Sequence, residues 1–120
     1  MLRQGGLKEA KRHFLEALVI NQRYEEALNN IGIISYSEGK YNEAIDYYLK
    51  ALKVNPDYPD AHNNLGVAMI SIGRMDDAIS HFKKALIINP EYEGAFGNLK
   101  KALKIKTDSD KKGNNMKKEK

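Results

Sequence analysis

The sequence of 120 residues contains no cysteine and no tryptophan. The absence of cysteine excludes disulfide bonds, cysteine-ligated zinc sites and thiol nucleophiles. No run of about 18 apolar residues occurs, which excludes a membrane-spanning helix, and the opening residues lack the pattern of a secretory signal. With 42% apolar and 30% charged residues, the composition is that of a water-soluble domain. We therefore expect a small cytoplasmic protein.

Acidic and basic residues are unevenly distributed along the chain. Residues 1–99 contain 11 Lys and Arg against 13 Asp and Glu, a net charge of −2. Residues 100–120 contain 9 Lys against 3 acidic residues, a net charge of +6. A basic end of this kind attracts nucleic acids or acidic proteins. Because it contains no aromatic residue and no arginine, a solvated tail is the favoured interpretation.

Proline is scarce, and its positions reveal a repeat. Two of the three prolines lie in the pairs Asn55-Pro56 and Asn89-Pro90, at the same place in two successive segments of equal length. These segments, 25–58 and 59–92, align without a gap, and 14 of their 34 positions are identical. A fixed period of this length indicates a solenoid of stacked supersecondary units.

Each unit contains two stretches with apolar residues at helical spacing. Gly39 and Gly73 separate the two stretches, as glycine does at the left-handed end of a helix, and the Asn-Pro pairs end the second stretch. This pattern predicts an all-α, right-handed solenoid of antiparallel helix pairs. We expect about six helices and a disordered basic C-terminal tail.

The residues that recur resemble the tetratricopeptide repeat, whose pattern of large and small residues has a period of 34. The matching residues are Ile31-Gly32, Ala44, Tyr48, Ala51 and Pro56 in the first unit, and Leu65-Gly66, Ala78, Phe82, Ala85 and Pro90 in the second. The sequence departs from the family pattern at its tryptophan position, which holds Leu28 and His62, and at its first-helix tyrosine position, which holds Ser35 and Met69.

The resemblance extends beyond the two complete units. Residues 1–24 are expected to form a partial first repeat that retains only its second helix, at about residues 7–20. Residues 25–58 and 59–92 are two full repeats, and residues 93–106 are a capping helix in which Lys100 replaces the family glycine. Residues 107–120 lack periodicity and are expected to be disordered.

Catalytic and metal-binding motifs are weak or missing in this sequence. No glycine-rich phosphate loop and no nucleophilic serine motif occurs. His13 and His81 share one repeat position and are expected to face outward, while His62 is expected to pack within a helix pair. We therefore predict no enzyme activity, no cofactor and no metal site.

The C-terminal tail contains a partial match to a calcium-binding loop. Asp108, Asp110, Gly113 and Glu119 occupy matching positions. Lys112 stands where such a loop needs an oxygen ligand. We therefore expect the tail to bind no calcium.

The family resemblance implies a peptide-binding groove lined by the first helix of each repeat. Carried over position by position, the groove residues are Glu26, Asn29, Asn30, Ile33, Tyr36, Ser37, Asp60, Asn63, Asn64, Val67, Ile70, Ser71, Asn98, Lys101 and Lys104. Asn30, Asn64 and Asn98 recur once per repeat, like the asparagine ladder in arrays of O-linked N-acetylglucosamine transferases. Amides of this kind pair with a peptide backbone. Alternatively, these asparagines cap or bridge neighbouring helices.

Three functions are compatible with this sequence. The first is a protein-interaction scaffold that binds a peptide in the groove, although Glu26 and Asp60 would repel a terminal carboxylate. The second is a substrate-recruiting part of a transferase or larger protein, and the third is nucleic-acid binding through the Lys-rich end. The first helix that would cover Leu7, Phe14 and Leu18 is missing. We therefore expect repeats upstream in a longer parent protein to cover these side chains or, where such repeats are absent, self-association with a second copy of the chain.

Overall fold

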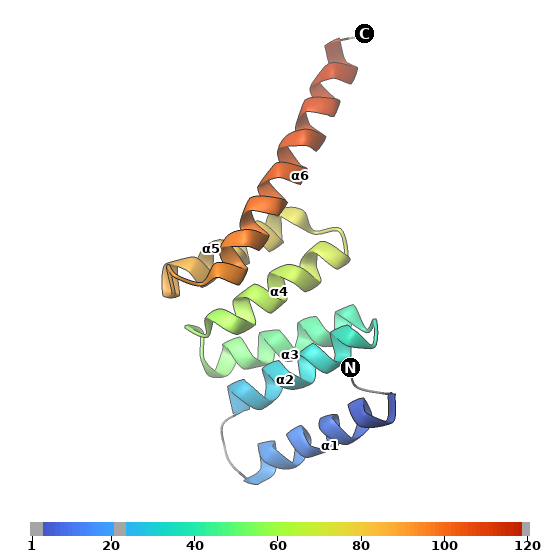
Figure 1. Ribbon diagram of the computed structural model, residues 1–120, viewed down its shortest axis with the longest axis vertical. Helices are drawn as coiled ribbons and strands as arrows, with labels where there is room; N and C mark the ends of the chain where they lie inside the picture. The colour runs from blue at the N-terminus through green and yellow to red at the C-terminus, as the bar shows by residue number, and fades with distance from the viewer. Residues whose placement is uncertain (1–3, 21–23, 119–120) are drawn as a thin grey trace.

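The computed structural model describes residues 4–20 and 24–118. These residues form helices and no strands, which confirms the predicted all-α solenoid (Figure 1). The helices are α1 (Gln4–Ile20), α2 (Tyr24–Ser37), α3 (Tyr41–Val54), α4 (Pro59–Ser71), α5 (Met75–Ile88) and α6 (Glu93–Lys118). No helix among the described residues has the length and apolar character needed to cross a membrane.

Consecutive helices pack against one another, and the pairs stack along the long axis of the molecule (Figure 1). The molecule is 61 × 31 × 23 Å, with α6 projecting from one end. α2 also contacts α4, and α4 contacts α6. The first helices of successive repeats therefore lie side by side and share one surface.

Two glycines allow the helices of each pair to approach closely. A Cβ atom at Gly32 would collide with the ring of Tyr48, and one at Gly66 would collide with the ring of Phe82. Both rings are almost completely buried. The alanines that recur in the repeat pattern, Ala44, Ala51, Ala78 and Ala85, are all fully buried. The recurring small residues thus make room for one large aromatic ring in each repeat.

The ends of the helices follow the predicted signals. Gly39 and Gly73 have φ angles of 78° and 80°, the left-handed conformation that ends α2 and α4. At the ends of α3 and α5, the amides of Asn55 and Asn89 close the last helical turn. The side-chain oxygen of Asn55 then accepts a hydrogen bond of 3.1 Å from the amide of Asp57, which turns the chain away.

The prediction that a capping helix ends at residue 106 and is followed by a disordered tail is wrong for the described residues. α6 continues to Lys118. The reason lies at residue 107, where the repeat period would place the next turn glycine but the chain has Thr107. Its hydroxyl donates a hydrogen bond of 2.8 Å to the carbonyl oxygen of Leu103, within the helix. Residues 103–112 are all exposed, so this part of α6 projects into solvent.

The calcium-loop match lies on the same helix. Asp108, Asp110 and Gly113 belong to α6 rather than to a loop. Glu119 lies outside the described residues. The three described residues that match the calcium-loop spacing are therefore part of a helix.

The opening helix α1 begins at Gln4, before the expected position 7. Phe14 is half-buried, whereas Tyr48 and Phe82 at the same repeat position are 2% and 0% exposed. Leu7 is also half-buried, and the side chain of Leu18 lies outside the described residues. α1 packs against α2. The apolar side chains of α1 are therefore covered more completely on the side that faces α2 than on the opposite side.

Candidate peptide-binding surface

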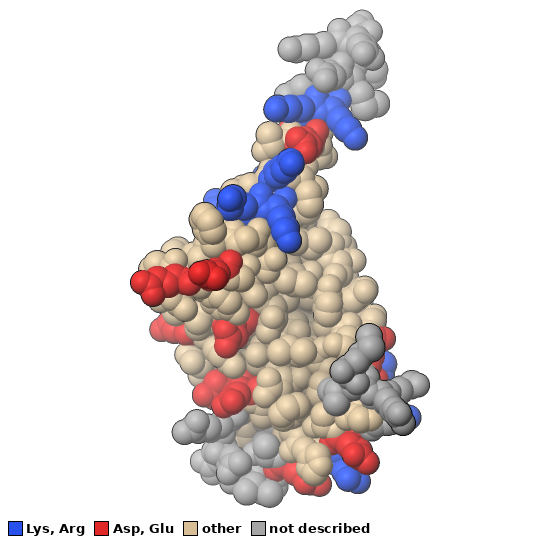
Figure 2. Space-filling view, viewed as in Figure 1, with Lys and Arg blue, Asp and Glu red and all other residues tan. Residues whose placement is uncertain are grey.

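The candidate site is the surface that α2 and α4 share, which we call the groove face. It consists of the exposed or half-buried side chains Asn30, Ile33, Tyr36 and Ser37 of α2, and Asn64, Val67, Ile70 and Ser71 of α4. Figure 2 shows a broad surface over these helices without charged side chains. Acidic side chains gather along its left edge, and basic side chains gather on α6.

The predicted residues fall into two groups by accessibility. Ile33 is 41% exposed, and Ser37 and Ser71 are also exposed at the C-terminal ends of their helices. In contrast, Asn29 and Asn63 are only 4% and 8% exposed. The prediction that these two asparagines line the groove is therefore corrected, because they are buried between the helices.

Hydrogen bonds between asparagines join the repeats. Nδ2 of Asn64 donates to Oδ1 of Asn29 at 3.1 Å, and Nδ2 of Asn98 donates to Oδ1 of Asn63 at 3.0 Å. The alternative in which asparagines bridge neighbouring helices thus applies to Asn64 and Asn98. Because a carboxamide has two N–H donors and an acceptor oxygen, one bridging bond leaves part of the Asn64 amide for a ligand.

A second bridge joins the two repeats at the other end of the groove face. The hydroxyls of Tyr36 and Ser71 lie 2.8 Å apart. Ser71 also donates to the carbonyl oxygen of Val67 at 3.3 Å, and Ser37 donates to that of Ile33 at 3.0 Å. These bonds hold the serines against their own helices and fix the position of the Tyr36 ring relative to α4.

Glu26 and Asp60, which were predicted to line the groove, are exposed in the first turns of α2 and α4, at the edge of the groove face. Carboxylates are favourable there because the N-terminal end of a helix is positive. The carboxylates affect the pKa values of two tyrosines, Tyr92 and Tyr58. Burial, followed by the neighbouring Asp60, raises the pKa of Tyr92 to about 12. Burial and then Asp60 and Glu26 also raise the pKa of Tyr58.

Tyr58 and Tyr92 were not among the predicted site residues. The signal was present, because Tyr24, Tyr58 and Tyr92 recur once per repeat, directly before or at the start of each first helix. Tyr92 Oη lies 3.5 Å from Nδ2 of Asn63, so it links the edge of the groove to the buried asparagine pair.

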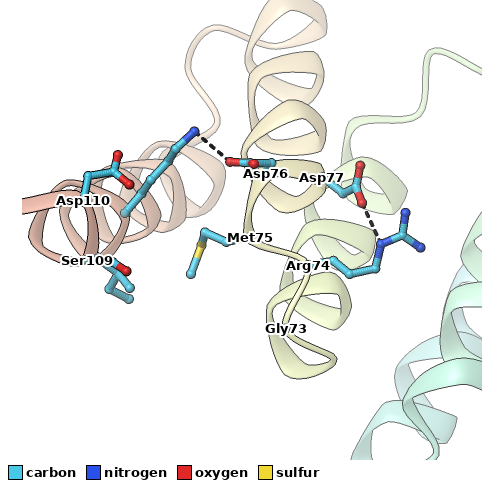
Figure 3. A pocket seen from close by; sticks show the side chains of 9 residues that line it. Gly73, Arg74, Met75, Asp76, Asp77, Ser109 and Asp110 are labelled. Atoms are coloured by element: carbon cyan, nitrogen blue, oxygen red, sulfur yellow. Dashed lines mark hydrogen bonds and ion pairs between the residues drawn. The ribbon is translucent and has the colours of Figure 1, made fainter. Parts of the chain in front are cut away.

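Lys101 and Lys104, which were predicted to extend the groove, are exposed on α6, while Asn98 is half-buried. Another basic residue of α6 is already paired: Nζ of Lys106 lies 2.7 Å from Asp76 at the start of α5. Figure 3 shows this pair beside the ion pair of Arg74 and Asp77, around a hollow of about 530 Å³ between α5 and α6. This hollow lies at the helix junction and not among the groove residues.

The histidines differ from the prediction in one respect. His62 is 7% exposed and packs within the helix pair, and His13 is exposed. His81, however, does not face outward, because its Nδ1 lies 3.2 Å from Nδ1 of His62. In the part of the chain that the structure describes, no three His, Asp or Glu side chains gather closely enough to hold a metal ion.

Sequence profiles of known families match most of the chain. Profiles described as tetratricopeptide repeat match residues 2–52 and 59–92, and one described as TPR repeat matches residues 33–73. Together they span residues 2–92. No curated protein matches the chain.

Solved structures of TPR domains have the same fold. The Sgt2 TPR domain from Aspergillus fumigatus has a TM-score of 0.81 at 18% identity, over 88% of this chain and 71% of that chain. The first TPR domain of Spaghetti (RPAP3), bound to an HSP90 peptide, has a TM-score of 0.78 at 18% identity, over 87% and 82% of the two chains.

A third similar structure is a mutant of the O-GlcNAc transferase from Thermobaculum terrenum, with a TM-score of 0.76 at 28% identity. The match covers 84% of this chain but only 19% of the transferase chain. The regular repeat period, the close glycine–aromatic contacts and these similarities agree. The chain belongs to the tetratricopeptide repeat family, and its repeats resemble those of O-GlcNAc transferase arrays.

Proposed function

We propose that the chain is a protein-interaction scaffold that binds a peptide segment of a partner along the groove face. The observation that carries this proposal is the uncharged strip over α2 and α4, in which amides, hydroxyls and apolar side chains alternate. Amides and hydroxyls pair with a peptide backbone, and Ile33, Val67 and Ile70 offer apolar contacts to its side chains. The chain has no catalytic role in this proposal.

The charges at the edge of the groove face indicate which segment fits. The Spaghetti domain was solved with the HSP90 peptide SRMEEVD, which is acidic. In this chain Glu26 and Asp60 are exposed at the edge of the groove face, and Asn30 and Asn64 lie on it. An acidic C-terminus would meet repulsion there, so the proposed partner segment is neutral or basic.

A matched pair of substitutions tests the groove face. Ile33 on α2 is 41% exposed, and Leu49 on α3 is 46% exposed. Ile33→Glu and Leu49→Glu therefore place the same charge at similarly exposed sites, one on the groove face and one outside it. On an array of neutral, basic and acidic peptides, Ile33→Glu should weaken binding of neutral peptides at least tenfold, and Leu49→Glu should not. Equal losses for both variants would contradict the groove proposal.

The similarity to the O-GlcNAc transferase supports a second candidate, in which the array recruits substrates for an enzyme. In that case the peptides bound by the groove face should be the segments that the enzyme modifies. Binding of the peptides without any modification of them by an associated transferase would argue for the simple scaffold.

The projecting part of α6 supports a third candidate, nucleic-acid binding. Lys100, Lys101, Lys104, Lys111 and Lys112 are exposed on this helix (Figure 2). A charge-driven complex loses affinity steeply between about 50 and 200 mM salt, whereas a peptide held by the groove face does not. Titration of single-stranded and double-stranded DNA at both salt concentrations tests this candidate.

We also propose self-association through α1, where Leu7 and Phe14 are only half-buried and Leu15 is 43% exposed. Phe14→Glu should then convert a dimer into a monomer in light scattering at several concentrations. A wild-type chain that stays monomeric at high micromolar concentration would contradict this proposal.

A further inference from the structure

Two histidines meet where α4 packs on α5. Nδ1 of His62 lies 3.2 Å from Nδ1 of His81, and the two rings are stacked with their centroids 5.5 Å apart. Nε2 of His62 lies 2.8 Å from the carbonyl oxygen of Pro56, in the turn between α3 and α4. His62 is buried and His81 is half-buried. The two rings therefore connect two helices and the turn between repeats.

The chemistry of these contacts fixes where the protons lie. A carbonyl oxygen only accepts hydrogen bonds, so Nε2 of His62 carries a proton and donates it to Pro56. Nδ1 of a neutral His62 is then unprotonated and accepts from the N–H of Nδ1 on His81. A continuous path of hydrogen bonds runs from α5 through α4 to the turn, and it requires His62 to be neutral.

The fold itself does not require histidine at these positions. In the preceding repeat the same positions hold Leu28 and Tyr47. Leu28 and Tyr47 pack in an apolar cluster there. Where the first repeat has an apolar contact, the second repeat thus has a histidine contact that depends on protonation.

We propose that the His62–His81 contact is a pH-sensitive switch, which holds α4 against α5 near neutral pH and loosens the second repeat in mild acid. The hydrogen bond needs one Nδ1 without a proton, so a proton on both Nδ1 atoms would leave two N–H groups facing each other at 3.2 Å. Such a contact is repulsive even before charge is considered, and two imidazolium rings would add like-charge repulsion. Asn64 and Val67 lie on α4, so loosening this helix also disturbs the groove face.

The charged groups around the pair favour the neutral state. Burial first, then Lys84 and His62, lower the pKa of His81 to about 4, and Asp77 opposes this shift. Lys84 and Asp57 line a hollow of about 330 Å³ next to His62. From α6, Lys106 pairs with Asp76 in the first turn of α5. The carboxylates nearby thus offset Lys84 only in part.

The direction of the pH effect follows from this lowered pKa. An unfolded chain takes up a proton on His81 near its ordinary pKa of about 6.5, but the folded chain does so only near 4. Stability is therefore fully present above about pH 6.5 and is lost as the pH falls toward 4. From pH 7.5 to 5.5 this histidine raises the unfolding equilibrium constant, and because solvent reaches part of its ring the increase stays below about tenfold. Most carboxylates titrate below this range.

The experiment uses residues from the preceding repeat as replacements. Urea unfolding of the full chain is followed by circular dichroism at pH 7.5 and 5.5 for the wild type and for the double variant His62→Leu with His81→Tyr. These residues reproduce the Leu28 and Tyr47 contact. The wild type should be clearly less stable at pH 5.5, and the double variant should lose at least half of that difference.

A control and a second measurement keep the test decisive. His13 occupies the same repeat position as His81 but is exposed, so His13→Asn should keep the wild-type pH dependence. If the double variant does not fold, amide hydrogen exchange of α4 in the wild type is measured instead at pH 5.5 and 7.5. After correction for intrinsic rates, α4 should exchange faster at pH 5.5. Unchanged pH dependence in the double variant, or equal protection of α4 at both pH values, would overturn the switch.

Discussion

The two complete repeats, residues 25–58 and 59–92, share their glycines and differ at one of the contacts between their paired helices. In both, a glycine receives an aromatic ring, Gly32 with Tyr48 and Gly66 with Phe82. In both, a glycine with a positive φ ends the first helix. At another contact within the helix pair the first repeat has Leu28 and Tyr47, where the second has His62 and His81. The comparison teaches that the two repeats keep the small residues that set their backbone geometry, whereas an individual packing contact can change from apolar to polar.

The close glycine–aromatic contact should tolerate substitution least. Gly66→Ala places a methyl group against the ring of Phe82, which is fully buried and has no room to move. We expect a loss of about 1–3 kcal/mol in the free energy of unfolding, measured with urea. Gly32→Ala should cost a similar amount, because Tyr48 is 2% exposed.

Gly97 on α6 provides the control for this prediction. A Cβ atom at Gly97 meets nothing within 4 Å. Gly97→Ala should therefore stabilise the protein by about 0.5–1 kcal/mol, through the higher helix propensity of alanine. A destabilisation of Gly97→Ala equal to that of Gly66→Ala would show that contact with an aromatic ring is not what determines the cost at position 66.

The fold was predictable from the sequence because its determinants recur at one period. Gly39, Gly73 and the Asn-Pro pairs mark the helix ends in both repeats, and the structure agrees at each. The failure at α6 has the same origin. Thr107 stands at the position of the turn glycines, and a residue with a Cβ atom disfavours the left-handed conformation. The absence of a glycine at position 107 therefore indicates that the helix continues.

The candidate site was less predictable, because its contacts join positions that the alignment of the repeats does not place opposite one another. We expected Asn30, Asn64 and Asn98 to form a row of equivalent residues. The bonds instead join residues 35 apart, from Asn64 to Asn29 and from Asn98 to Asn63. The His62–His81 contact spans 19 residues and exists in one repeat. Such diagonal and unique contacts depend on how helices pack in three dimensions, which the alignment of repeats does not contain.

The turn glycine gives a second, smaller test of the comparison between helices. Gly73 has a φ angle of 80°, and a Cβ atom there meets nothing within 4 Å. Gly73→Ala therefore costs only the backbone strain, about 1 kcal/mol. Conversely, Thr107→Gly should lower the helical signal in circular dichroism without changing the urea midpoint of the two repeats. A large change in that midpoint would mean that the end of α6 supports the repeats.

A last pair of substitutions separates the two roles of the asparagines. Asn64 donates to the buried Asn29, whereas Asn30 occupies the same position of the first repeat, where α1 and not a preceding first helix lies alongside α2. Asn64→Ala removes the bond and should cost about 0.5–1.5 kcal/mol in urea unfolding, because the Asn29 oxygen loses its partner inside the protein. Asn30→Ala should cost less. If both asparagines also bind a peptide backbone, both variants should weaken peptide binding by a similar factor. Unequal stability with equal losses of binding would therefore assign a structural and a binding role to Asn64, and a binding role alone to Asn30. Unchanged peptide binding in both variants would contradict a binding role for either asparagine.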